Sequence, residues 1–146
     1  MKRILDYFIG LLACFAEFGE QQTIPGFTAA VDLSAKQYHI VRPAGTLTCD
    51  IASHALGSSA VGAPLGVLQT DPRTGEAATI AFAGLSKVVT GAAVTVNALV
   101  STNGSGRAID AVSGSVVIGR AIEATSNDGE VATVLLFPPV RWGSVA

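Results

Sequence analysis

The sequence predicts an all-β protein, a small β-barrel or sandwich with an extended N-terminal arm and, as one alternative for its first residues, a short amphipathic helix. Short β-rich segments bounded by turn residues recur between residues 36 and 137, at the spacing of about 8–12 residues that is typical of sandwiches and barrels. No helical period appears after residue 35. The 146 residues correspond to one domain, which is large enough to fold without a disulfide or a metal.

Residues 1–16 form an apolar N-terminal segment with three alternative interpretations. In the first, an amphipathic helix docks on a partner or a neighbouring subunit, because its apolar residues have 3- and 4-residue spacing. In the second, the basic start and small-residue end form a secretory signal or lipid anchor, although Asp6 interrupts the run. In the third, the segment is an upstream extension. We expect a membrane partner only under the second interpretation. The apolar stripe comprises Ile4, Leu5, Phe8, Leu12 and Phe15.

Residues 17–35 are predicted to form an extended arm, because they show little periodicity and contain isolated apolar side chains in a polar context. Pro25 pushes Ile24 toward an extended conformation, and Pro25-Gly26 marks a turn. Such a segment can anchor on another protein by strand addition; a disordered leader is the alternative. The residues predicted to make this contact are Phe18, Gln21, Gln22, Thr23, Ile24, Pro25, Gly26 and Phe27.

Residues 36–137 are predicted to form the β body. Turn clusters at residues 70–75 and 103–106 separate its segments. Pro43 is expected to end the first strand and Pro138-Pro139 to end the last, since proline cannot donate to a strand ladder. The predicted strands are residues 37–42, 46–51, 66–69, 78–82, 85–90, 94–100, 116–122 and 131–137.

A short motif, Gly-Glu-x-Ala-Thr, occurs twice in the body. It begins at Gly75 and again at Gly129, 54 positions later (129 − 75). Each copy follows a β-rich segment and precedes another, which predicts a hairpin whose glycine adopts a positive φ at the turn. Two related hairpins suit a compact barrel, while a chance resemblance is the alternative.

The C-terminal tail, residues 138–146, contains the only tryptophan, Trp142, next to Arg141. Tryptophan and arginine dominate the binding energy of many protein interfaces. We therefore predict that Arg141 and Trp142 form an interface, in preference to a Trp142 that folds back over the end of the barrel.

The charge pattern excludes direct nucleic-acid binding and favours contact with other proteins. Only 14% of the residues are charged, against about 25% in typical domains. The net charge is −2, and the nine basic residues are scattered rather than clustered, whereas phosphate binding requires a basic stripe. A weakly charged, apolar exterior is typical of a component of an assembly.

No pattern in the sequence predicts catalysis, a cofactor or a metal. Nucleotide-binding loops and the G-x-S-x-G nucleophile motif are absent. Ser53 and His54 would point to opposite faces of a strand, so a triad with Asp50 is disfavoured. The two cysteines and two histidines lack zinc-ligand spacing, and we expect both thiols to be free. The acidic turn at Asn127, Asp128 and Glu130 is interpreted as solvated. The four rejected zinc ligands are Cys14, Cys49, His39 and His54.

The order of several motifs resembles that of bacteriophage capsid cement, or head-decoration, proteins over about residues 17–137. The motifs are DLSAKQY (residues 32–38), GVLQ (66–69), Pro72, GEAAT (75–79), GLSKVV (84–89) and GRAIEA (119–124). The resemblance implies a non-enzymatic virion protein that assembles in the host cytoplasm, forms trimers and binds the major capsid protein on the outside of the head. It would brace the capsid against packaged DNA, with the arm residues given above as its contact with the capsid. Residues 1–16 depart from the family pattern.

Two other classes of function remain alternatives to this resemblance. The first is a secreted or lipid-anchored bacterial β-domain that acts as a binding module, directed by residues 1–16. The second is an enzyme or small-ligand binder with its site in the mouth of a barrel.

Overall fold

The computed structural model describes residues 21–53 and 63–143, and nine strands form within them. No helix occurs in these two ranges, so none of the described residues forms a helix that could cross a membrane. The all-β prediction is confirmed; the predicted N-terminal segment, residues 1–16, lies outside the described residues. The strands are β1 (Gln22–Ala29), β2 (Ile40–Gly45), β3 (Thr48–Ile51), β4 (Gly66–Leu68), β5 (Ala77–Val89), β6 (Leu99–Thr102), β7 (Ala108–Asp110), β8 (Val116–Ala121) and β9 (Val131–Arg141).

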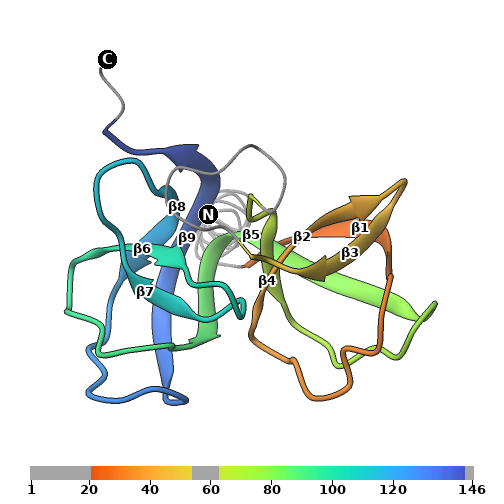
Figure 1. The fold of residues 1–146 in the computed structure, drawn as a ribbon, viewed down its shortest axis with the longest axis horizontal. Coiled ribbons are helices and arrows are strands. Elements are labelled where there is room, and N and C mark those ends of the chain that lie inside the picture. Colours follow the sequence, from red (N-terminus) through yellow and green to blue (C-terminus); the bar gives the residue numbers. More distant parts are fainter. Residues whose placement is uncertain (1–20, 54–62, 144–146) are drawn as a thin grey trace, which may run out of the picture.

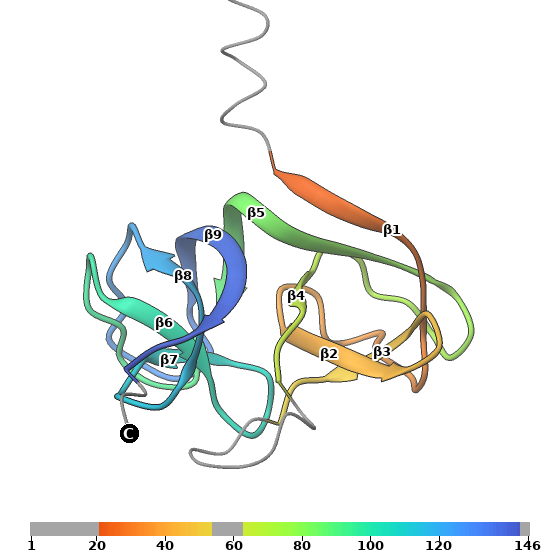
Figure 2. The same ribbon diagram turned by 90° about the horizontal axis from the view of Figure 1, so that it is seen from above.

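The strands are arranged in two lobes that share β5 (Figures 1 and 2). The sheet order is β1-β3-β2-β4-β5-β9-β8-β6-β7, with an additional pairing between β1 and β5. We call residues 21–53 and 63–83 the first lobe and residues 84–143 the second lobe. The nine strands do not close into a single barrel, because β1 pairs back with β5 and not with β7, which lies at the other end of the order. The sandwich alternative of the predicted fold class therefore fits.

Strand β5 replaces two predicted strands, residues 78–82 and 85–90, with one of 13 residues. Its first half pairs with β1 and β4, and its second half pairs with β9. The change of partner falls between Ala83, opposite Gln22, and Gly84, opposite Leu136. No turn is required there, so the break expected from the sequence was wrong.

The repeated Gly-Glu-x-Ala-Thr motif forms two equivalent hairpin turns, as predicted. Gly75 joins β4 to β5 with a φ of 83°, and Gly129 joins β8 to β9 with a φ of 82°. Both φ values lie in the left-handed region that glycine adopts without steric cost. The Gly75 N–H donates to Ala29 O and the Gly129 N–H to Thr90 O, each at 2.8 Å. The two turns therefore close on equivalent strand ends.

The equivalence extends through both lobes. Tyr38 and Asn97 both adopt a positive φ, 64° and 69°, and their N–H groups donate to Leu68 O and Ala121 O, each at 2.7 Å. A parallel pairing also recurs, between Ala29 and Cys49 in the first lobe and between Thr90 and Ala108 in the second. Each lobe is thus one copy of a five-strand unit, with β5 contributing its first half to one copy and its second half to the other.

The two lobes are joined by a fully buried apolar contact. The first lobe has its own core, formed by Ala29, Leu33, Val41, Cys49, Leu68, Ala78 and Ile80. Four other residues of the first lobe, Ile40, Ala52, Val67 and Ala81, belong instead to the cluster that fills the second lobe. All four are 0% exposed. Each lobe therefore depends on the other for part of its burial.

Two proline positions differ from the sequence prediction. Strand β9 continues through Pro138 and Pro139 to Arg141, although the prolines were expected to end it. Its pairing with β8 jumps from Val117–Val140 to Gly119–Leu136, so both prolines lie in an irregularity of the ladder. Proline is tolerated there because no ladder N–H is needed. Strand β2 likewise continues through Pro43 beside a register shift.

The region after β5 also differs from the prediction. The predicted strand at residues 94–100 begins only at Leu99, and Val94 makes an isolated bridge to Thr125. The three-residue strand β7 was not predicted. A strand this short carries too little alternation to be recognised without its partner β6.

Candidate interaction surfaces

Most of the predicted arm belongs to the β body. Strand β1 pairs with β5 from Gln22–Ala83 to Thr28–Ala77. Ile24 lies half-buried opposite Ile80, and Phe27 packs against the first-lobe core. The extended conformation predicted from Pro25 is present, but within the described residues the strand is added to a sheet of its own chain. The boundary at residue 35 is corrected accordingly, and Phe18 lies outside the described residues.

A bulge in β1 leaves part of this strand at the surface. Ile24 pairs with Ile80 and Phe27 with Ala78, so Pro25 and Gly26 together face a single residue of β5. Gly26 has a φ of 87°, and both bulge residues are exposed. Bulges bend a strand and re-aim its side chains. Of the predicted arm residues, those exposed in the structure are Gln22, Thr23, Pro25 and Gly26.

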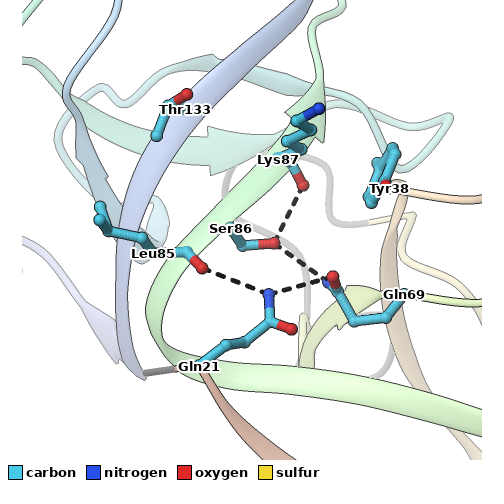
Figure 3. A pocket seen from close by; sticks show the side chains of 7 residues that line it. All are labelled: Gln21, Tyr38, Gln69, Leu85, Ser86, Lys87 and Thr133. Carbon is cyan, nitrogen blue, oxygen red and sulfur yellow. Dashed lines mark hydrogen bonds between the residues drawn. The ribbon is translucent and has the colours of Figure 1, made fainter. Parts of the chain in front are cut away.

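The chain enters β1 beside a small groove between the lobes (Figure 3). Gln21 Nε2 donates to Gln69 Oε1 at 3.0 Å and to Leu85 O at 3.3 Å. Gln69 Nε2 in turn donates to Ser86 Oγ at 3.0 Å. The groove has a volume of about 270 Å³ and is lined by Gln21, Tyr38, Gln69, Leu85, Ser86, Lys87 and Thr133. Its amides and hydroxyl satisfy one another and fix the residue that precedes β1.

Two of the four residues that were rejected as zinc ligands from the sequence, His39 and Cys49, are buried in the first lobe. The imidazole Nδ1 of His39 lies 3.2 Å from Gln37 O, and because a carbonyl only accepts, Nδ1 must carry the proton. Nε2 has no partner. Burial lowers the pKa of His39 and raises the pKa of the Cys49 thiol. Cys14 and His54 lie outside the described residues, and among the described ones no three His, Cys, Asp or Glu side chains form a metal cluster.

The acidic turn before β9 is occupied by its own hydrogen bonds. Glu130 accepts from the Ser126 N–H at 2.8 Å and from Asn127 Nδ2 at 3.0 Å. The bond from Asn127, followed by that from Ser126, lowers the pKa of Glu130. Asp128 forms a 2.7 Å ion pair with Arg107. The carboxylates therefore stabilise the turn.

Exposed apolar side chains are concentrated on the second lobe. In the first lobe, the large exposed ones among the described residues are Val31 and Leu47. In the second they are Leu85, Val96, Val112, Ile122, Val131, Leu135, Val140 and Trp142. This unequal distribution is the main surface feature of the molecule, because contiguous exposed apolar side chains mark interaction sites.

Four of these side chains form what we call the strand face: Leu85, Ile122, Val131 and Leu135. Leu85 on β5 pairs directly with Leu135 on β9, and Val131 occupies the same side of β9. The Ile122 N–H donates to Thr133 O, which places Ile122 beside the same stretch of β9. All four are between 43% and 49% exposed. The face was not singled out from the sequence.

Three others form what we call the tail patch: Val112, Val140 and Trp142. The Trp142 N–H donates to Ser115 O at 2.9 Å, and Trp142 O accepts from the Gly114 N–H at 2.8 Å. These bonds fix the backbone of the predicted tail, while the Trp142 side chain remains 42% exposed. The other predicted tail residue, Arg141, is exposed at the end of β9.

Comparisons with known proteins agree with this architecture. The family model described as phage cement protein matches residues 28–136. The crystal structure of the head fiber gp8.5 N base in bacteriophage phi29 superposes with a TM-score of 0.58 at 18% identity. That match covers 84% of this chain and 99% of the head fiber chain, and it shows a shared fold. Among curated proteins, none matches the chain. The resemblance identified from the sequence motifs is confirmed.

Proposed function

Because the chain belongs to the phage cement protein family, we propose that it binds the outer surface of a phage head and stabilises it against internal DNA pressure. Its partners in this proposal are the major capsid protein and two further copies of itself, in a non-catalytic homotrimer that joins the virion in the host cytoplasm. The observation that carries the proposal is the concentration of exposed apolar side chains on the second lobe of a weakly charged protein.

The tail patch is the first surface proposed to contact the capsid. Its backbone is fixed by the bonds between Trp142 and the Gly114–Ser115 turn, so little conformational entropy is lost on binding. Burying a large apolar side chain stabilises a contact by about 1.5–3 kcal/mol. A protein that binds only the assembled shell stabilises it by about 2.7 kcal/mol per site at a hundredfold excess over Kd. Repeated over a lattice, that increment raises the stability of the whole head.

The second proposed contact is the exposed edge of β1 together with the residues that precede Gln21, including Phe18. The bulge at Pro25-Gly26 is exposed, and the bonds from Gln21 fix the start of the strand. A substitution must spare Phe27, which packs in the core. Thr23→Glu, at an exposed site of β1, is the appropriate variant, and Thr74→Glu, exposed in the turn between β4 and β5, is its matched control.

The test uses heads that lack this protein. We expect the purified protein to co-sediment with them at a fixed, saturable ratio and to raise the temperature at which they release DNA. Trp142→Ala should weaken binding about tenfold or more, whereas Val31→Ala, at an exposed site of the first lobe, should leave it unchanged. A wild-type protein that fails to bind heads would overturn the proposal.

A further inference from the structure

One row of side chains in the first lobe is completely buried. It crosses three strands through the pairs Ile40–Val67 and Val67–Ala81. The residues are 0% exposed, and they belong to the apolar cluster that fills the second lobe. The row lies outside the first lobe's own core, so it is buried because another lobe covers it.

The equivalent row of the second lobe crosses β6, β8 and β9 through the pairs Leu99–Arg120 and Arg120–Leu135. The correspondence follows from the matching hydrogen bonds of Tyr38 and Asn97, which lie two residues before Ile40 and Leu99. Here the row is open: Leu135 is 43% exposed, Arg120 is exposed and Leu99 is half-buried. Leu135 is also part of the strand face.

The turn between β6 and β7 packs over the first-lobe row. In this turn, Gly106 O accepts from the Ile40 N–H at 2.7 Å. The approach is close, since a side chain at Gly106 would lie 2.6 Å from Ile40 O. A second bond joins the lobes, from the Val89 N–H to Tyr38 O at 2.9 Å.

The first lobe carries the counterpart of this turn at its own surface. Leu47 precedes Cys49 by two residues, as Gly106 precedes Ala108, and Cys49 and Ala108 occupy the same position in the parallel pairings. Leu47 also shares the positive φ of Gly106, 51° against 70°. Its side chain is 58% exposed. The turn between β2 and β3 therefore carries an exposed apolar side chain, Leu47. In a second copy of the chain, this turn is the one that could pack over the open row.

We propose that the strand face and the row Leu99–Arg120–Leu135 bind the first lobe of a second copy of this chain, with Leu47 of that copy against Leu99. This inference rests on the proposed trimer and assigns its interface. The contact is head-to-tail, and head-to-tail contacts between identical chains generate closed rings when the rotation permits. Three copies would give a ring of six similar lobes.

The residues that differ between equivalent positions of the two lobes fit a second copy of the chain as the binding partner. Leu47 has a side chain where Gly106 has none, so the second copy must lie farther from the row than the second lobe lies from the first. The open row is correspondingly larger, with Leu135 in place of Ala81. Arg120 stands in place of Val67 and donates to Asn97 Oδ1 at 2.9 Å, and arginine is enriched in protein interfaces.

The first test measures the oligomeric state by sedimentation equilibrium. We expect wild-type trimers, and we expect Leu135→Asp and Leu85→Asp each to raise the dissociation constant at least roughly tenfold, because a charge would replace a buried leucine. Both side chains point outward, so the circular dichroism spectrum should stay unchanged, which shows that each chain keeps its fold. Val112→Asp, in the tail patch, is the control and should remain trimeric. A monomeric wild type, or trimers that persist in both variants, would overturn the inference.

The second test locates the contact. Two proteins, Leu47→Cys and Leu99→Cys, each with Cys14→Ser, are mixed and treated with a short bis-maleimide. A covalent dimer is expected from this mixture and none when Val31→Cys replaces Leu47→Cys; equal yields from both mixtures would contradict the inference.

Head binding is measured separately. Trimers that do not bind heads would overturn the proposed function alone, whereas Leu135→Asp trimers that lose head binding would assign the face to the capsid and overturn the inference alone.

Discussion

The two lobes have the same strand order and the same turn motif, but their outer rows are chemically different. The first lobe has Ile40, Val67 and Ala81, all buried by the second lobe. The second lobe has Leu99, Arg120 and Leu135 in the corresponding row, open to solvent to different degrees. The backbone hydrogen bonds around each row are preserved. The repeated unit therefore specifies the fold, and function is to be sought where the two copies differ.

Exchanging the central residues of the two rows should change the stability of the protein the most. Val67→Arg places an unpaired charge in the fully buried contact between the lobes, and we expect it to lower the free energy of unfolding by about 3–5 kcal/mol. Arg120→Val, at the exposed equivalent, should change it by less than about 0.5 kcal/mol. Urea denaturation of both variants checks the difference, and similar losses would show that the rows are not distinct.

A substitution in the first-lobe core tests whether the two lobes unfold together. Ile80→Ala, in the first-lobe core, should destabilise the protein by about 2–5 kcal/mol. Because four first-lobe residues complete the second-lobe cluster, Trp142 fluorescence in the second lobe should report the same shifted midpoint as far-UV circular dichroism. Separate midpoints would mean that each lobe is an independent unit.

The sequence predicted the parts of this comparison that depend on local chemistry. The hairpins at Gly75 and Gly129 were predicted because a glycine turn between β-rich segments is a local signal. The joining of residues 78–82 and 85–90 into β5 was not, because it depends on a change of partner at Ala83. The pairing of β1 within the body was missed for a similar reason, since its partners on β5 lie between 49 (77 − 28) and 61 (83 − 22) positions along the chain.

The surfaces were predictable to a smaller extent. Trp142 and Arg141 could be chosen because their residue types are frequent at interfaces, and the structure places both at the surface. The strand face could not be chosen, because Val131 and Leu135 alternate along β9 with the buried Ala132 and Val134. Both sets are apolar, so the sequence alone does not distinguish the inward side of this strand from the outward one.

The first lobe should also make a smaller, pH-dependent contribution to stability that the second lobe lacks. His39 is buried in the first lobe, and its equivalent in the second is Ala98, as the matched bonds to Leu68 and Ala121 show. Burial lowers the folded-state pKa of His39, with Lys36 and Arg107 as nearby cations that lower it further. Its contribution is therefore fully favourable above the unfolded pKa of about 6.5 and is lost as the pH falls below it. We expect Tm to fall more between pH 7.5 and 5 in the wild type than in His39→Gln; equal falls would exclude His39 as the cause.

The smallest effect on stability, and the sharpest separation of surfaces, comes from two equivalent exposed positions. Thr23 on β1 pairs with Ala81 on β5. In the corresponding place of the second lobe, Leu85 on β5 pairs with Leu135 on β9. Glutamate at either site should change the free energy of unfolding of the single, dissociated chain by less than about 0.5 kcal/mol, because both side chains are exposed. If the β1 edge binds the capsid and the strand face binds a second copy, Thr23→Glu should weaken head binding about tenfold and keep the trimer. Leu85→Glu should dissociate the trimer at the same protein concentration. Identical behaviour of the two variants in both assays would mean that the two lobes present one continuous surface rather than two with separate partners.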